Sequence, residues 1–387
     1  MTHFPRTSQR SPGFTLVEVM LSTAIISLIL LVLVSVTSQT SSTWRYTTGK
    51  IEQFRESRAA FETITTKISQ ATLNTYWDYD SPTLPTRYER RSELRFISGQ
   101  ASQGADALLG NGSTESGGTS YRVTQCLFFH APLGIADRAD YKGLENLLNV
   151  WGYFVEFRDD KKLRPSFVTD ATSPPKFRFR LMEFMQPSEN LPTYLYTSGL
   201  DGSKPKSAGY VDKTWFKTAV NASSSPSRPV AENIIALILT PRLSKSDELA
   251  YNKANGGSSN PDISPLAPLY SFDSTKVKNS GVTVSDAKAL KQINPKNQLP
   301  PVIQVTMVAI DEVSASRLRL DAGKSDIFKL SGKFTDTSKY TADLVVKPGA
   351  AADASLENTL IDKKVSYRFF TTNIPIRAAK WSREQVN

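Results

Sequence analysis

Cysteine and histidine are almost absent from this chain of 387 residues. Cys126 is the sole cysteine, so no intramolecular disulfide can form and the fold depends on packing. His130 is one of two histidines, and the other, His3, lies near the N-terminus. A tetrahedral zinc site usually needs four suitable ligands, so the sequence does not predict one. We expect neither a metal nor a cofactor.

The sequence also lacks the motifs of common enzymes. Residues 323–325 read Gly-Lys-Ser, like the end of a phosphate-binding loop, but Leu318 stands where that loop needs its first glycine. Adjacent carboxylates such as Asp311 and Glu312 point to opposite sides of a strand, so they do not form a catalytic pair. We therefore expect no enzymatic activity, and an exported, membrane-anchored enzyme is the weakest hypothesis.

No dense basic run accounts for the positive net charge. The 47 Lys and Arg exceed the 37 Asp and Glu by 10, which gives the formal charge of +10, and they are scattered along the chain. Scattered cations indicate an ordinary charged surface. Binding of the head to DNA, anionic lipid or an acidic partner is the alternative.

One long apolar segment stands at the N-terminus. Residues 14–36 hold a single charge, Glu18, and about 20 mostly apolar residues suffice to cross a bilayer. Arg6 and Arg10 precede it without an acidic residue, which by the positive-inside rule keeps the N-terminus in the cytoplasm. A secretory signal is the competing interpretation, but the apolar core of such a signal has only roughly 7 to 15 residues.

Residues Gly13 to Glu18 read GFTLVE. This motif resembles the type III leader junction of type IV prepilins and of type II secretion pseudopilins. The resemblance implies that a membrane-embedded prepilin peptidase cuts between Gly13 and Phe14 and methylates the new terminal residue, Phe14. A small residue before the cut suits entry of an extended backbone into a protease, because glycine has no Cβ.

Glu18 needs a partner inside the apolar helix. A carboxylate costs about 2.5 to 3.5 kcal/mol at the centre of a membrane helix and less near its end. The same resemblance implies that the Glu18 carboxylate pairs with the terminal amine of a neighbouring subunit during assembly, which offsets this cost. A tolerated charge near the membrane surface is the simpler alternative.

The apolar segment is predicted to continue outward as one helix. No proline occurs between Phe14 and Ser81, so nothing in the sequence breaks the helix there. The candidate packing residues share spacings of three and four and hence one helical face. They are Phe54, Phe61, Ile64 and Ile68. This stripe is expected to pack against a sheet of the same chain, and a coiled-coil dimer through the same stripe is the alternative.

The rest of the chain is predicted to be a β-rich head with long loops. The whole chain has 22 Pro and 20 Gly, which favour turns, and 10% of the chain is aromatic. The predicted strands are residues 94–97, 121–129, 151–157, 177–184, 234–240, 302–310 and 365–371, which are rich in branched and aromatic residues. Several alternate apolar and charged residues, so we expect antiparallel strands with one solvated face. Residues 310–320 are predicted to form a short helix.

These expectations combine into one domain plan. It comprises a prepilin leader (1–13), a transmembrane helix (14–36), its extracytoplasmic continuation (37–80) and a β-rich head (81–387). The fold class is α+β, with the long helix packed on an antiparallel sheet. The arrangement resembles the minor pseudopilin of the J kind and the tryptophan-class minor pilins, which end in a strand like residues 367–370. Residues 308–312 also resemble the prepilin-like C proteins of the Verru_Chthon cassette.

The resemblance implies a function as well. It implies a minor pseudopilin or pilin subunit of a type II secretion or type IV pilus-like filament, anchored once in the bacterial cytoplasmic membrane with its head outside. The implied partners are the prepilin peptidase, other pseudopilins or minor pilins, the inner-membrane assembly platform and the lipid bilayer, with secreted cargo or DNA as further candidates. The alternative is a surface-displayed binding module, for DNA uptake or adhesion, on the same anchor.

Overall fold

The computed structural model describes Gly13 and most of the chain from Thr15 to Ser382. The gaps are residues 82, 105, 114–118, 145, 166, 192–195, 202–203, 208–214, 223, 256–259, 285–289, 291 and 347–353. Within the described part, the side chains of residues 49–53, 113, 196–201, 204–207, 215 and 255 are not described. The chain divides into two compact units, residues 1–53 and residues 54–387. We call the second unit the head.

Helix α1 runs from Leu16 to Ser69 and belongs to both units. It ends well before residue 80, so the predicted continuation over 37–80 is too long. The reason lies in the segment that follows, where Thr, Asn, Tyr and Trp favour extended backbone over helix. The Thr72 N–H donates to the His130 carbonyl at 2.8 Å, and the Arg377 N–H donates to the Ser69 carbonyl at 3.0 Å. Both bonds replace a further helical turn.

The head contains two main antiparallel sheets. The first has the strand order β10-β7-β6-β5-β3-β12, with β4 paired to β5. Its strands are β3 (Ile97–Gln100), β4 (Gly112–Ser113), β5 (Thr119–Pro132), β6 (Leu148–Arg158), β7 (Arg178–Gln186), β10 (Ser227–Glu232) and β12 (Phe272–Asp273). The second has the order β11-β13-β14 and comprises β11 (Ile234–Arg242), β13 (Val302–Ile310) and β14 (Tyr367–Pro375). Antiparallel sheets beside a long helix confirm the predicted α+β class.

Two hairpins and several short helices decorate the sheets. The hairpins are β1 (Tyr76–Tyr79) with β2 (Tyr88–Arg91), and β8 (Tyr196–Asp201) with β9 (Lys204–Ser207). The short α-helices are α3 (Trp215–Asn221), α4 (Lys245–Asn255), α6 (Glu312–Arg317), α7 (Tyr340–Leu344) and α8 (Leu356–Asp362). The 3-10 helices are η1 (Ala139–Tyr141), η2 (Lys161–Leu163), η3 (Ser188–Asn190), η4 (Ala322–Lys324) and η5 (Thr337–Lys339). Helix α6 lies inside the segment predicted as a short helix.

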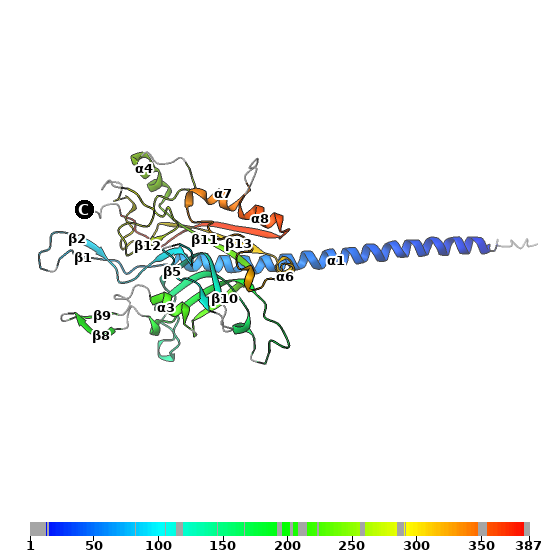
Figure 1. Cartoon of the computed structure of the whole chain (residues 1–387), viewed down its shortest axis with the longest axis horizontal. Coiled ribbons are helices and arrows are strands. Elements are labelled where there is room, and N and C mark those ends of the chain that lie inside the picture. The colour runs from blue at the N-terminus through cyan, green and yellow to red at the C-terminus, as the bar shows by residue number, and fades with distance from the viewer. Residues whose placement is uncertain are drawn as a thin grey trace, which may run out of the picture. The chain divides into compact units, whose positions relative to one another are not determined.

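The last four turns of α1 bury one face in the core of the head, and they contact β14 and β6 (Figure 1). Ile64 and Ile68 are fully buried and Phe61 nearly so. The Phe61 ring lies 5.7 Å from the Phe370 ring of β14. Burial of each such side chain contributes roughly 1.5 to 3 kcal/mol, so this helical segment is part of the head.

The expected solvated sheet face is not observed on the central strands. β6 and β7 are buried along almost their whole length, on both faces. A second apolar cluster, which includes Phe216 and Val220 of α3, covers part of the outer face. The charged outer residues Glu156 and Arg180 are only 4% and 2% exposed. The alternation in the sequence is real, but α3 packs on the outer face and β10 extends the sheet beside β7, so charged residues of that face are buried. The sequence pattern does not reveal this cover.

Candidate processing and assembly site

The start of α1 is closed by a reciprocal pair of side chains. The Thr15 N–H donates to Glu18 Oε2 at 3.0 Å, and the Glu18 N–H donates to Thr15 Oγ1 at 3.3 Å. The Thr15 hydroxyl also donates to Glu18 Oε2, at 3.0 Å. This is a capping box, in which Thr15 is the N-cap and Glu18 is the third helical residue. The pair fixes the first turn of the helix and orients the carboxylate toward the N-terminus.

Only one carboxylate oxygen is engaged by this box. All the bonds that Glu18 accepts from Thr15 go to Oε2, so among the described residues Oε1 has no donor. A carboxylate has about four lone-pair sites, and a buried one needs most of them filled. The geometry therefore leaves Glu18 able to accept a bond from a further cation while it keeps its helix cap.

Several hydroxyls near Glu18 are satisfied within the helix. Residues 16–48 form a span of 33 residues that is long and apolar enough to cross a membrane. The hydroxyls of Ser22, Ser27 and Thr37 each donate to the carbonyl four residues earlier, at 2.7 to 2.8 Å. Such bonds satisfy polar groups within the helix, as a bilayer requires. Glu18 differs from these hydroxyls because it carries a charge, and a charge in the apolar part of the span calls for an external partner.

Gly13 stands immediately before this site. A Cβ built on Gly13 meets no atom of the chain within 4 Å, and its φ lies outside the left-handed region. The fold itself therefore does not require glycine at this position, which favours an external reason such as entry into a peptidase. Phe14 lies outside the described residues. Its cleavage and methylation stay predictions.

The other predicted site residues lie elsewhere, in the head. Phe61, Ile64 and Ile68 are in the main core, and Phe54 packs on its edge while partly buried. Lys67, one position before Ile68, donates to Glu183 Oε1 at 2.7 Å and lies 4.0 Å from the Trp151 ring centroid. These contacts attach α1 to the first sheet. They belong to the head and form no part of the processing site.

Sequence reasoning missed Thr15. The signal was present, because Thr-x-x-Glu before an apolar run is the pattern of a capping box. Thr15 was assigned only to the predicted transmembrane helix, residues 14–36. The structure shows that Thr15 positions the Glu18 carboxylate, so the two side chains form one site.

The head's titratable candidates are structural. His130 is 1% exposed, and its Nδ1 donates to the Arg95 carbonyl at 3.2 Å. Burial lowers the pKa of His130 to about 4. Cys126 is also buried, which raises the pKa of its thiol. Among the described residues, no group of three or more His, Cys, Asp or Glu is arranged to hold a metal ion.

Comparison with known proteins agrees with this geometry. Residues 9–34 match the family model of the prokaryotic N-terminal methylation motif. No curated protein and no solved structure gives a significant match. The apolar helix and the matched motif together support membrane anchoring. The matched leader fits a type IV prepilin- or pseudopilin-like protein, and it implies processing by prepilin peptidase and assembly with other pilins.

Proposed function

We propose that the mature chain, beginning at Phe14, is a minor pseudopilin or minor pilin of a type II secretion or type IV pilus-like filament. One observation carries the proposal. Nearby hydroxyls such as those of Ser22 and Ser27 bond to their own helix, whereas Glu18 Oε1 has no donor among the described residues and is open to a cation from outside the chain. The terminal amine that peptidase cleavage creates on a neighbouring subunit is a cation of the right size and depth.

The size of the head supports a minor position. Two sheets, two hairpins and long insertions surround a single helix, and the head extends over residues 54–387. A filament shaft repeats one subunit at short intervals, so a large head suits the tip or its neighbourhood, where one side has no subunit above it. The resemblance to the J kind of minor pseudopilin and to tryptophan-class minor pilins supports the same position.

The proposed role is structural, with no catalytic step. The helix inserts once into the bacterial cytoplasmic membrane, with its leader in the cytoplasm and its head outside. It leaves the bilayer for the filament through an inner-membrane assembly platform. Its exposed apolar side chains contact lipid first and the helices of other pilins afterwards.

Substitution of Glu18 tests the proposal. In cells that hold the native filament system, Glu18→Ala is expected to leave membrane insertion and leader cleavage intact and to abolish recovery of the chain in sheared filaments. Ser22→Ala, one turn along the same helix, is the matched control, because its hydroxyl bonds only within the helix. Normal incorporation of Glu18→Ala would contradict the role of the carboxylate in assembly.

A further inference from the structure

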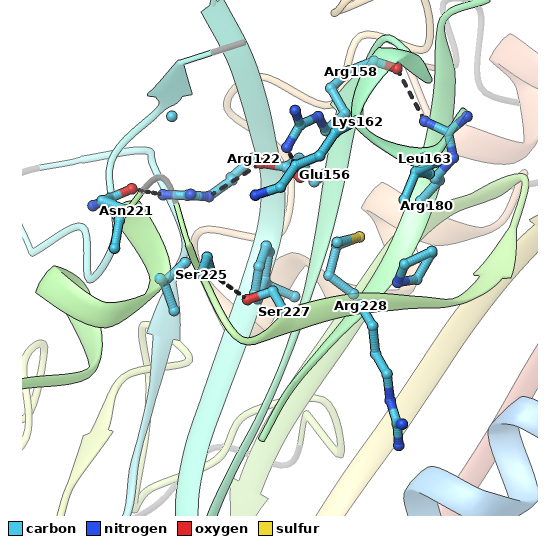
Figure 2. A pocket seen from close by; sticks show the side chains of 16 residues that line it. Arg122, Glu156, Arg158, Lys162, Leu163, Arg180, Asn221, Ser225, Ser227 and Arg228 are labelled. Atoms are coloured by element: carbon cyan, nitrogen blue, oxygen red, sulfur yellow. Dashed lines mark hydrogen bonds and ion pairs between the residues drawn. The ribbon is translucent and has the colours of Figure 1, made fainter. Parts of the chain in front are cut away.

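A cavity of about 400 Å³ lies on the outer face of the first sheet, within the head (Figure 2). Strands β5, β6 and β7 form its floor, the edge strand β10 lies beside β7 at one side, and α3 with the loop after it contributes to the lining as well. Its charged lining residues are Arg122, Glu156, Arg158, Lys162, Arg180 and Arg228. Five cations therefore accompany a single carboxylate. A volume of a few hundred Å³ is in the range of small-ligand pockets.

Two of these arginines have partners that hold them away from the cavity. Arg180 donates from Nε to Glu232 Oε1 at 2.9 Å and from Nη1 to the Arg158 carbonyl at 3.2 Å. Arg228 donates from Nη2 to Glu183 Oε2 at 2.7 Å, and its side chain points away from the cavity in Figure 2. Both have a full carboxylate partner. Both residues line the cavity, but their guanidinium groups are engaged by these carboxylates.

Arg122 and Arg158 are less completely neutralised than Arg180 and Arg228. Glu156 lies 3.8 Å from Arg122 Nε and 3.7 Å from Arg158 Nη1, which are ion pairs too long for hydrogen bonds. Its Oε1 accepts instead from the Ser120 hydroxyl at 2.8 Å. One carboxylate is thus shared by two guanidinium groups, and the net charge of this trio is +1.

Both of these guanidinium groups also carry an unused donor. The Nε atoms of Arg122 and Arg158 are buried without a hydrogen-bond partner among the described residues. The Arg122 side chain is only 3% exposed, and its Nη1 is held by Asn221 Oδ1 at 2.6 Å and by the Gly110 carbonyl at 3.2 Å. Buried donors without acceptors are rare in folded proteins, and a bound anion commonly satisfies them.

The wall beside these cations is apolar. Phe154 lies under the Arg122 guanidinium, 5.3 Å from its carbon to the ring centroid, and Met182 and Val220 are also part of the lining. Burial lowers the pKa of Arg122 because it removes the charge from water, and the nearby Glu156 carboxylate offsets this effect only in part. The site therefore combines excess positive charge with an aromatic and aliphatic surface.

We propose that this cavity binds a small anionic molecule in which a carboxylate or phosphate group is attached to an aromatic or short aliphatic body. The guanidinium groups of Arg122 and Arg158 receive the oxyanion, since their planar forks match both groups. The body rests on Phe154 and Met182. The proposal concerns the head and does not depend on leader cleavage or filament assembly.

Isothermal titration calorimetry on the full mature protein in a non-ionic detergent tests the site. Phenyl phosphate and benzoate are the two anionic probes, and phenol is the neutral probe with the same ring. We expect saturable binding of at least one anion with one site per chain, and no binding of phenol. A preference between the two anions identifies the oxyanion, and inorganic phosphate alone is expected to bind more weakly because it lacks the ring.

Variants distinguish anion binding in this cavity from anion binding by positive charge elsewhere on the protein. Arg158→Gln is expected to weaken binding of the preferred anion by about tenfold or more, the scale of one charge-assisted contact. Arg122→Lys keeps the charge and is expected to weaken binding as well, since it removes the fork. Arg242→Gln is the control, because Arg242 pairs with Glu248 outside the cavity. Near-ultraviolet circular dichroism shows that each variant is folded.

Two results would overturn the proposal. One is the absence of binding of both anions to the wild-type protein at millimolar concentration. The other is equal binding to the wild type and to folded Arg158→Gln, since the anion would then be held by charge elsewhere on the chain.

Discussion

At the scale of single residues, the most informative side chains are those that the fold leaves incompletely satisfied. Glu18 has one carboxylate oxygen engaged by Thr15 and one without a donor among the described residues. Arg122 and Arg158 each have a buried Nε without an acceptor in the described part of the chain. Buried or membrane-embedded polar groups are normally paired, so each of these points to a partner outside the chain.

The two kinds of residue differ in how well sequence predicts them. Gly13, Phe14 and Glu18 form a contiguous motif, so a local pattern was sufficient to select them. Arg122 and Arg158 alternate with aromatic residues on their strands, which is the pattern of a solvated face. Their burial depends on α3 and β10, which come later in the chain. No local pattern could have predicted that cover.

His130 provides a prediction at this scale. Its pKa is about 4 in the folded head against an ordinary value of 6.5, so the unfolded chain binds the proton more readily. The stability contributed by the neutral ring is therefore present above pH 6.5 and is lost as the pH falls toward 4. The loss amounts to about 3 kcal/mol between pH 7 and pH 4.

A comparison with His130→Asn isolates this effect, since asparagine keeps a donor for the Arg95 carbonyl and does not titrate. Urea unfolding of both proteins at pH 7 and pH 4 is expected to show a steeper loss of stability for the wild type, by about 3 kcal/mol. Parallel pH dependences of the two proteins would contradict the buried neutral state of His130.

At the scale of elements, long or strongly patterned segments were predicted and short ones were not. The strand expected at residues 302–310 is β13 with the same bounds, because six of its nine residues are β-branched and favour extended backbone. The hairpin of β1 and β2 was not predicted, because its strands do not alternate apolar and polar residues and because Trp77 is exposed. The segment between the predicted strands 234–240 and 302–310 was expected to be a long loop, yet it contains α4 and β12. Strand β12 pairs with β3, far earlier in the chain, and a local pattern does not encode such pairing.

The end of α1 gives a prediction at this scale. Residues 81–387 were expected to form the head, but a protein cut at residue 81 lacks Phe61, Ile64 and Ile68. Their burial contributes roughly 5 to 9 kcal/mol, at about 1.5 to 3 kcal/mol each, which is comparable with the whole stability of a domain. Residues 54–387 are expected to unfold cooperatively on heating, as followed by circular dichroism.

The shorter protein, residues 81–387, is expected to show no cooperative transition or to aggregate. Equal melting temperatures of the two proteins would mean that the last turns of α1 are not part of the core of the head.

At the scale of the whole molecule, the chain divides its tasks between two compact units. The first unit holds the leader motif and the exposed apolar helix, and its chemistry was predictable because it is local in sequence. The second unit holds the sheets and the cationic cavity, and its chemistry arises only when distant strands meet. Some of its cations are held in ion pairs, such as Arg95 with Asp273 and Arg242 with Glu248, while the formal net charge of the whole chain remains +10.

The most direct test of the account is the mass of the N-terminal peptide of the protein purified from its native membrane. The account predicts that the peptide begins at Phe14 and carries one methyl group on its terminal amine. A chain that retains its first thirteen residues, or one that begins beyond the apolar helix, would contradict the account.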